Sequence, residues 1–131
     1  MTEIRARPCS ACPYRRDVPS GVWAPEEYDK LRPYDEPTMG QPAAGFACHA
    51  TPEFYCHGWA VVHSARDHAF ELLALRFDRH GWPPPDSGVP MFGSAAEAAD
   101  WGQRDADDPD EAAQLAMDKL TRQHERLRRN G

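Results

Sequence analysis

The residues whose types and spacing most clearly indicate chemistry are four cysteines that occur in two pairs. Cys9 and Cys12 are separated by two residues, and Cys48 and Cys56 by seven. A C-x2-C pair lets two thiolates reach one metal ion from a single tight turn, and the prolines beside the first pair stiffen that turn. We therefore predict that all four cysteines bind one metal centre.

Two kinds of centre suit four sulfur ligands: tetrahedral zinc and an iron–sulfur cluster. Zinc is slightly favoured, because it is a common structural ion in small intracellular domains. The iron–sulfur cluster is the alternative, because the gap between Cys48 and Cys56 is wider than the usual zinc spacing and a cluster holds its sulfurs farther apart. Thioredoxin-like redox chemistry is less favoured, since residues 4–7 are too short and too charged for the buried strand that it needs.

Two histidines directly follow cysteines of the second pair: His49 follows Cys48, and His57 follows Cys56. Either histidine could replace a cysteine as a ligand, or lie behind the site with a hydrogen bond to a sulfur. A loop position without a role at the site is the simpler interpretation of each. The remaining histidines fall in helical patterns and are expected at the surface or boundary of the fold: His63, His68, His80 and His124.

The sequence gives little support to an enzyme, because it contains no H-E-x-x-H, G-x-S-x-G or Walker A motif. A catalytic zinc keeps one coordination position open, whereas four cysteines would close the site. No catalytic residue is assigned, although Asp17, Asp35 and Glu53 would be the acids or bases nearest the metal. The favoured function is therefore a small non-enzymatic metal-binding protein that acts through contacts with another protein. The alternative is an iron–sulfur redox sensor or regulator.

The elements that must position the cysteines are few. Residues 1–24 and 34–58 are rich in proline and glycine and read as irregular. Trp59 begins an apolar segment that is either a short helix or a strand. Capping signals and apolar stripes with a 3.6-residue period predict helices near residues 25–32, 67–80, 94–101 and 109–129. The predicted fold is a mainly α single domain over residues 1–131. Its four-cysteine part (1–64) is stapled by the metal, and its helical part (65–131) contains a proline-rich linker near 82–93.

Composition restricts the partners. The chain has 131 residues and a formal net charge of -6, so nucleic acid is an unlikely partner. No apolar run approaches a membrane span, and the N-terminus lacks the apolar segment of a signal peptide, so a soluble cytoplasmic protein is expected. Another protein is the expected partner. Aromatic residues would form the contact if they were exposed, although packing in the core is favoured: Tyr14, Trp23, Tyr28 and Trp59.

An ordered set of short motifs carries a family resemblance. CSACPYRRDVPSGVW at residues 9–23 is followed by EEYDKL, YDEPT, FACH and CHGWA. Together they resemble a four-cysteine family of actinobacteria and their phages that is known only as a domain of unknown function. This resemblance covers residues 9–64. It implies one site for the four cysteines, with His49 and Trp59 near it, and it implies no activity. The string at residues 21–23 also resembles the Gly-Val-Trp turn of WhiB-like iron–sulfur regulators, whose cysteine spacing differs.

Overall fold

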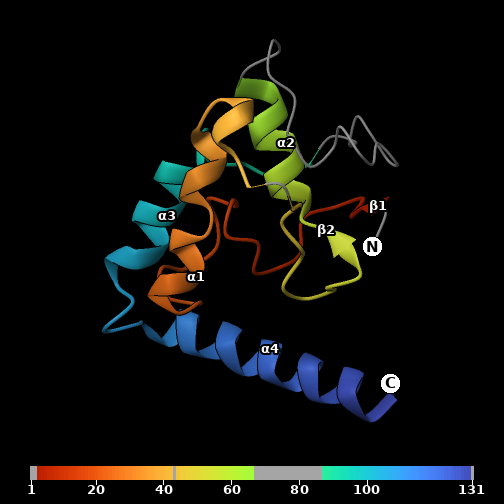
Figure 1. Cartoon of the computed structure of the whole chain (residues 1–131). Helices are drawn as coiled ribbons and strands as arrows, with labels where there is room; N and C mark the ends of the chain where they lie inside the picture. Colours follow the sequence, from red (N-terminus) through yellow and green to blue (C-terminus); the bar gives the residue numbers. More distant parts are fainter. Residues whose placement is uncertain (1–2, 43, 67–86, 131) are drawn as a thin grey trace.

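The structure is a computed structural model that describes residues 3–42, 44–66 and 87–130, and this part of the chain is mainly α-helical. Figure 1 shows helices α1, α2 and α3 grouped around the N-terminal loop, with α4 lying across one side of the molecule. The helices of these described ranges are α1 (Pro25–Asp29), α2 (His57–Arg66), α3 (Ala95–Arg104) and α4 (Glu111–Asn130). The shorter elements are the 3-10 turns η1 (Arg32–Asp35) and η2 (Thr38–Gly40) and the strands β1 (Glu3–Ile4) and β2 (Phe54–Tyr55).

The helices predicted near 94–101 and 109–129 are confirmed as α3 and α4, and α3 continues to Arg104. The helix predicted over 25–32 ends earlier, because Pro33 lies in the second turn and the chain continues as the separate 3-10 turn η1. The segment that begins at Trp59 belongs to helix α2. The helix predicted over 67–80 lies outside the described residues.

The structure describes the C-terminal end of the proline-rich linker expected near 82–93, and this end is bonded to the N-terminal loop. Phe92 donates its backbone N–H to the carbonyl oxygen of Tyr14 at 2.8 Å, and Met91 forms an antiparallel bridge with Arg15. The side chain of Phe92 is buried in the core. Residues that follow the linker are therefore attached directly to the turn that carries the first cysteine pair.

The core is built around aromatic side chains from several segments. Trp59 of α2 and Tyr14 of the N-terminal loop are fully buried, and Tyr28 of α1 is buried as well. Trp23 is partly buried, and its indole N–H donates to the carbonyl oxygen of Ala11. Tyr14, Tyr28 and Trp59 are therefore core residues, as the sequence favoured, and only Trp23 of the four is partly exposed. In a chain of this length these rings supply much of the available core.

Helix α3 packs closely against α1 because its inner face carries small residues. A Cβ atom added at Gly102 would lie 2.0 Å from Cε1 of Tyr28, so only glycine fits at this crossing. The carbonyl oxygen of Gly102 also accepts hydrogen bonds from the N–H of Gly21 and the hydroxyl of Ser20. This small-residue face brings α3 into contact with the N-terminal loop.

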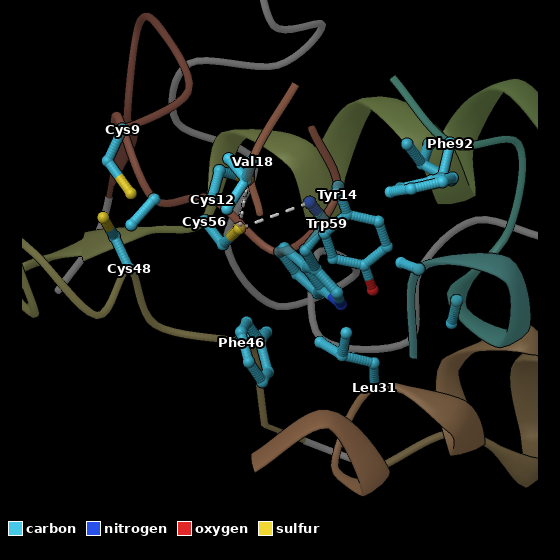
Figure 2. Packing of buried hydrophobic residues seen from close by; sticks show 14 of the residues in the cluster. Cys9, Cys12, Tyr14, Val18, Leu31, Phe46, Cys48, Cys56, Trp59 and Phe92 are labelled. Carbon is cyan, nitrogen blue, oxygen red and sulfur yellow. Dashed lines mark hydrogen bonds between the residues drawn. The ribbon is translucent and has the colours of Figure 1, made fainter. Parts of the chain in front are cut away.

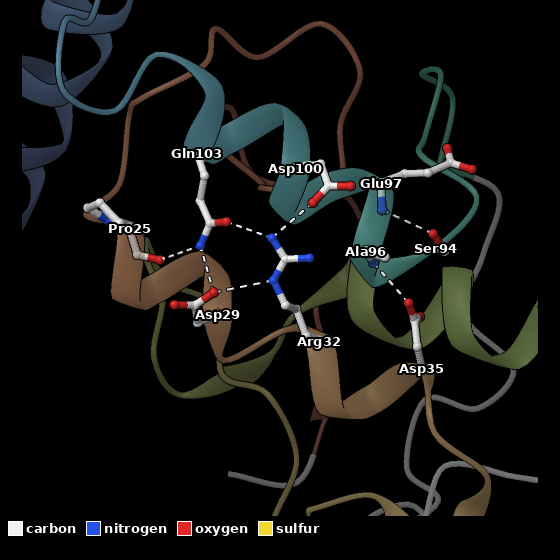
Figure 3. Close-up of polar contacts among 9 residues, drawn as sticks. All are labelled: Pro25, Asp29, Arg32, Asp35, Ser94, Ala96, Glu97, Asp100 and Gln103. Carbon is white, nitrogen blue, oxygen red and sulfur yellow. Dashed lines mark hydrogen bonds and ion pairs between the residues drawn. The ribbon is translucent and has the colours of Figure 1, made fainter.

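Polar contacts join α3 to α1 and η1, as Figure 3 shows. Arg32 forms ion pairs with Asp29 at 3.2 Å and Asp100 at 3.0 Å. The Asp35 carboxylate accepts the N–H groups of Ala95 and Ala96, both at 2.9 Å. Anions at a helix N-terminus are favourable, because the first N–H groups have no partner within the helix. The turn η1 thus fixes the start of α3.

Helix α4 is attached along only part of its length. Ala113 and Leu120 are buried, whereas Leu115 is 61% exposed and Leu127 is 47% exposed. Near its C-terminal end, His124 Nε2 lies 2.8 Å from the carbonyl oxygen of His49. In the described ranges, no helix is both long enough and apolar enough to span a membrane.

Candidate metal centre

The first cysteine pair lies in two successive turns of the N-terminal loop. The N–H of Cys12 donates to the carbonyl oxygen of Cys9 at 3.1 Å, and the N–H of Arg15 donates to that of Cys12 at 3.0 Å. Because the residue before a proline avoids the helical region, Pro8 and Pro13 keep these turns from extending into a helix. The C-x2-C spacing therefore gives the tight turn that was predicted.

The second pair lies on a short hairpin that the sequence did not reveal. The N–H of Cys48 donates to the carbonyl oxygen of Phe54 at 2.9 Å, and the N–H of Cys56 donates to that of Phe46 at 2.7 Å. These bonds flank an antiparallel bridge between Ala47 and Tyr55. Opposed residues share a face of a hairpin and faces alternate along a strand, so Cys48 and Cys56 lie diagonally on one face. The seven residues between Cys48 and Cys56 contain the turn of this hairpin.

The two segments meet so that each cysteine of the first pair faces one of the second. The Sγ atoms of Cys12 and Cys56 are 3.9 Å apart, and the side chain of Cys9 lies beside that of Cys48, close enough for each thiol to shift the pKa of the other. Figure 2 shows the two sulfur pairs beside the aromatic core. All four side chains are buried, with at most 5% of their surface exposed. The structure thus brings the cysteines that the sequence singled out together as two pairs, Cys12 with Cys56 and Cys9 with Cys48.

Backbone groups of nearby residues favour the charged form of the thiols. The N–H of Trp59 donates to Sγ of Cys56 at 3.5 Å, and the backbone groups of Tyr14 and Gly58 lower the pKa of Cys12. Hydrogen bonds to a thiolate stabilise its negative charge and offset part of the cost of burying it.

The sulfurs of the other pair are held in the same way. The hydroxyl and backbone of Thr51 and the backbone of Ala50 lower the pKa of Cys48, and the backbone of Ala11 lowers that of Cys9. Each of the four buried thiols therefore has neighbouring backbone groups that favour its charged form. Such groups are the outer contacts that typically surround metal-bound cysteines.

Each sulfur pair contains one acidic and one weakly acidic thiol. The hydrogen bond from Cys9 lowers the pKa of Cys48 to about 5, and that from Cys56 lowers the pKa of Cys12. The pKa of Cys9 is raised by its hydrogen bond to Cys48 and by burial, and the pKa of Cys56 by its hydrogen bond to Cys12 and by burial. Metal binding would have to displace the proton that each pair retains.

The four sulfurs do not converge on a single point. Across the ranges that the structure describes, no group of three or more histidine, cysteine, aspartate or glutamate side chains could hold a metal ion as it stands. Four cysteines around one zinc would each lie about 2.3 Å from the ion and ~3.8 Å from one another. The distance of 3.9 Å between the Sγ atoms of Cys12 and Cys56 fits two ligands of one metal. The four sulfurs as a whole form two pairs rather than one tetrahedral set.

His49 and His57 are engaged by other parts of the fold. His49 Nε2 lies 3.0 Å from Oε2 of Glu27, and its ring stacks on Trp23 at 4.3 Å between centroids. His57 is buried, with Nδ1 2.9 Å from the carbonyl oxygen of Arg5 and Nε2 2.8 Å from the hydroxyl of Ser87. The contact of His49 therefore connects the hairpin to α1, and the contacts of His57 connect the start of α2 to Arg5 and to Ser87.

The acids considered as catalytic groups have structural contacts or lie apart. Asp17 forms a two-point ion pair with Arg15, and the guanidinium of Arg15 holds the pKa of Asp17 below its usual range. Asp35 caps α3, as described above, and Glu53 is exposed. The structure does not gather Asp17, Asp35 and Glu53 at the cysteines.

The expectation that His63 lies at the surface or boundary of the fold is wrong. Its side chain is buried, and its Nε2 is 2.8 Å from the hydroxyl of Tyr14. The signal that could have identified this contact is the spacing of Trp59, Val62 and His63 at i, i+3 and i+4, the inner face of α2. The close approach of Gly58 to the site, from helix α2, was not predicted: a Cβ atom there would lie 2.8 Å from Sγ of Cys12.

Comparison with known proteins gives a family but no activity. The sequence model of a family of unknown function matches residues 4–124. This range extends the resemblance beyond residues 9–64 and includes the helices that follow the cysteines. No curated protein matches the chain, and no solved structure does.

Proposed function

We propose that this chain, which belongs to the family of unknown function DUF6283, is a non-enzymatic metal-binding protein. Its metal centre would be held by Cys9, Cys12, Cys48 and Cys56. The observation that carries the proposal is the burial of four cysteines from two distant segments, each with neighbouring backbone groups that lower its pKa. Such surroundings favour the thiolate form that binds a metal.

An iron–sulfur cluster of the [2Fe–2S] type is the cofactor that the sulfur pairs favour. In such a cluster each of the two irons carries two of the four cysteine sulfurs. The close contacts are Cys12 with Cys56 and Cys9 with Cys48, so each pair would bind one iron. A single zinc, which the sequence slightly favours, is the second candidate and would require the two pairs to move together.

The burial of the sulfurs supports a structural rather than a catalytic role. A substrate would have to reach a metal whose cysteine ligands are almost completely covered, whereas a catalytic metal keeps one coordination position open. We therefore include in the proposal that the protein acts through contact with another protein rather than by catalysing a reaction.

Single substitutions of the cysteines test the proposal. In protein purified without oxygen, Cys12→Ser and Cys48→Ser should each remove most of the bound metal and any visible absorbance. Ser10→Ala is the matched control, because this exposed residue lies in the same turn and carries no thiol. Full metal retention by both cysteine variants would show that the cysteines do not form the centre.

A further inference from the structure

A groove lies beside the cysteine hairpin, between α1 and the C-terminal end of α4. Its cavity volume is about 690 Å³, within the range of about 300–1,000 Å³ that is typical of sites for small molecules. We call it the α1–α4 groove. It is lined by Glu27, Lys30, Gly45, Phe46, Ala47, Cys48, His49, Pro52, His124, Leu127 and Arg128.

The walls of the α1–α4 groove are mainly apolar. Phe46 and Ala47 come from the first strand of the hairpin, Pro52 from its turn, and Leu127 from α4. Leu127 is 47% exposed although it lies on the stripe of α4 that faces the protein. Covering such apolar surface with a ligand is favourable by about 25 cal/mol per Å².

Charged groups line the same groove. Lys30 Nζ lies 2.9 Å from Oε1 of Glu27, and Glu27 also contacts His49, so the single carboxylate of the groove has two partners. Arg128 forms no ion pair with any other residue that the structure describes. With two cations and one carboxylate, the lining has a positive excess in a chain whose net charge is -6.

We propose that the α1–α4 groove binds a small carboxylic acid with an apolar body. The carboxylate pairs with Arg128 and Lys30, and the apolar body covers Phe46, Pro52 and Leu127. One guanidinium from α4 and one ammonium from Lys30, the residue that ends α1, match one carboxylate, because Arg binds such a group through two parallel N–H donors. A polyphosphate would require more cations than this groove contains.

The groove also has a direct connection to the cysteine site. Cys48 contributes to its lining, and His124 of α4 is held against the carbonyl oxygen of His49. A ligand in the groove would therefore contact both the hairpin that carries the second cysteine pair and the end of α4. This proposal stands independently of the metal, since its evidence is the shape and charge of the groove.

Octanoate is a suitable probe, and 1-octanol is its uncharged match. Titration of the full chain, as purified, should show saturable octanoate binding by NMR, with shifts at Phe46, His49 and Leu127. Octanol should bind at least fivefold more weakly, because it cannot pair with Arg128. No saturable binding of octanoate, or equal binding of octanol, would overturn the proposal.

Two substitutions on α4 locate the carboxylate. Arg128→Gln should raise the Kd for octanoate about tenfold, as expected for loss of one charged hydrogen-bonding partner. Arg129→Gln removes the same charge from the next residue, which does not line the groove, and should change the Kd less than about twofold. An equal effect of both variants would indicate nonspecific attraction to a basic helix end and would refute the site.

Discussion

At the scale of single residues, the cysteine site depends on donors and on space. Gly58 supplies both, because its backbone lowers the pKa of Cys12 and a Cβ atom there would lie 2.6 Å from Cβ of Tyr14. Neither Sγ of Cys12 nor Cβ of Tyr14 is the flexible end of a long side chain. A side chain at this position would therefore have to displace the sulfur or the turn that carries it.

Gly58→Ala tests this close packing. Alanine is the better helix former by about 1 kcal/mol, so the variant would be more stable if space were available. We expect instead a loss of about 1–3 kcal/mol in the free energy of unfolding and reduced metal retention, because the added methyl group overpacks the site. The measurements are urea denaturation and metal analysis. Gly93→Ala is the control, since its added Cβ would lie 3.7 Å from the nearest carboxylate oxygen of Glu97; equal effects would contradict the explanation.

Glu27 is the residue through which stability should depend on pH. Hydrogen bonds from His49 and Lys30 lower its pKa, so the folded state favours the charged form. The stabilisation is present above the unfolded pKa of about 4.3 and is lost as the pH falls through the depressed folded value. Glu27→Gln should therefore reduce stability at pH 7 and have progressively less effect below about pH 4.

Urea denaturation of wild type and Glu27→Gln across this pH range provides the measurement. Glu26→Gln is the matched control, because Glu26 occupies the same first turn of α1 and is exposed. It should change stability little at either pH. A Glu27→Gln effect that stays constant from pH 7 to pH 3 would show that the carboxylate charge is not responsible.

At the scale of elements, local signals predicted the helices that carry their own caps. Ser94 accepts the N–H of Glu97 at 3.1 Å at the start of α3, and Asp110 accepts that of Ala113 at 2.8 Å near the start of α4. Both contacts are formed by residues three apart, which the sequence displays directly. The existence of α3 and α4 was therefore predictable, although α3 ends three residues later than expected.

The cysteine hairpin was not predictable in the same way. Residues 46–56 contain Pro52 and lack the alternation of apolar and polar residues that identifies a strand. Their conformation depends on distant partners, because β2 pairs in parallel with β1, with Ile4 opposite Tyr55. The spacing of Cys48 and Cys56 could indicate a shared site, but the pairing of each with the first segment is a tertiary contact.

Asp35 connects two elements that are far apart in sequence, and its role can be tested. Asp35→Asn keeps the shape of the side chain but removes the charge and one of the two acceptors for α3. We expect the free energy of unfolding to fall by about 1 kcal/mol. Thermal or urea denaturation measures this loss of unfolding free energy. The control is Asp107→Asn, which makes the same change in the exposed loop after α3. If the two variants were equally stable, the cap would not contribute.

At the scale of the whole molecule, the four-cysteine half and the helical half are less separate than their sequences suggest. Ser20 and Arg32 contact the C-terminal part of α3, and His49 contacts α4. The later helices therefore pack on segments that contain many prolines and few regular hydrogen bonds. These segments supply many of the buried core side chains, so a metal that fixed them would contribute to the stability of the whole fold.

Metal removal should show this dependence. Structural zinc contributes of the order of 10 kcal/mol in small peptides, comparable with the stability of a complete domain. After anaerobic chelation, the amide N–H groups of Cys12, Cys48 and Cys56 should exchange with solvent first, because their hydrogen bonds hold the two cysteine segments. The N–H of Ala98, bonded to Ser94 within α3, should retain protection longer. Hydrogen exchange measured by NMR is the test. If the N–H groups of these cysteines were as protected after chelation as before, the account would be contradicted.

The central claim is that four buried cysteines hold one metal centre, and metal stoichiometry tests it most directly. The chain should be purified without oxygen and analysed for iron, zinc and acid-labile sulfide. Two irons and two sulfides per chain are expected, together with visible absorbance that disappears in Cys12→Ser. One zinc per chain would retain the centre and overturn the [2Fe–2S] assignment. A chain that contains no metal, has four titratable thiols and is as stable as any metal-supplemented sample would contradict the claim itself.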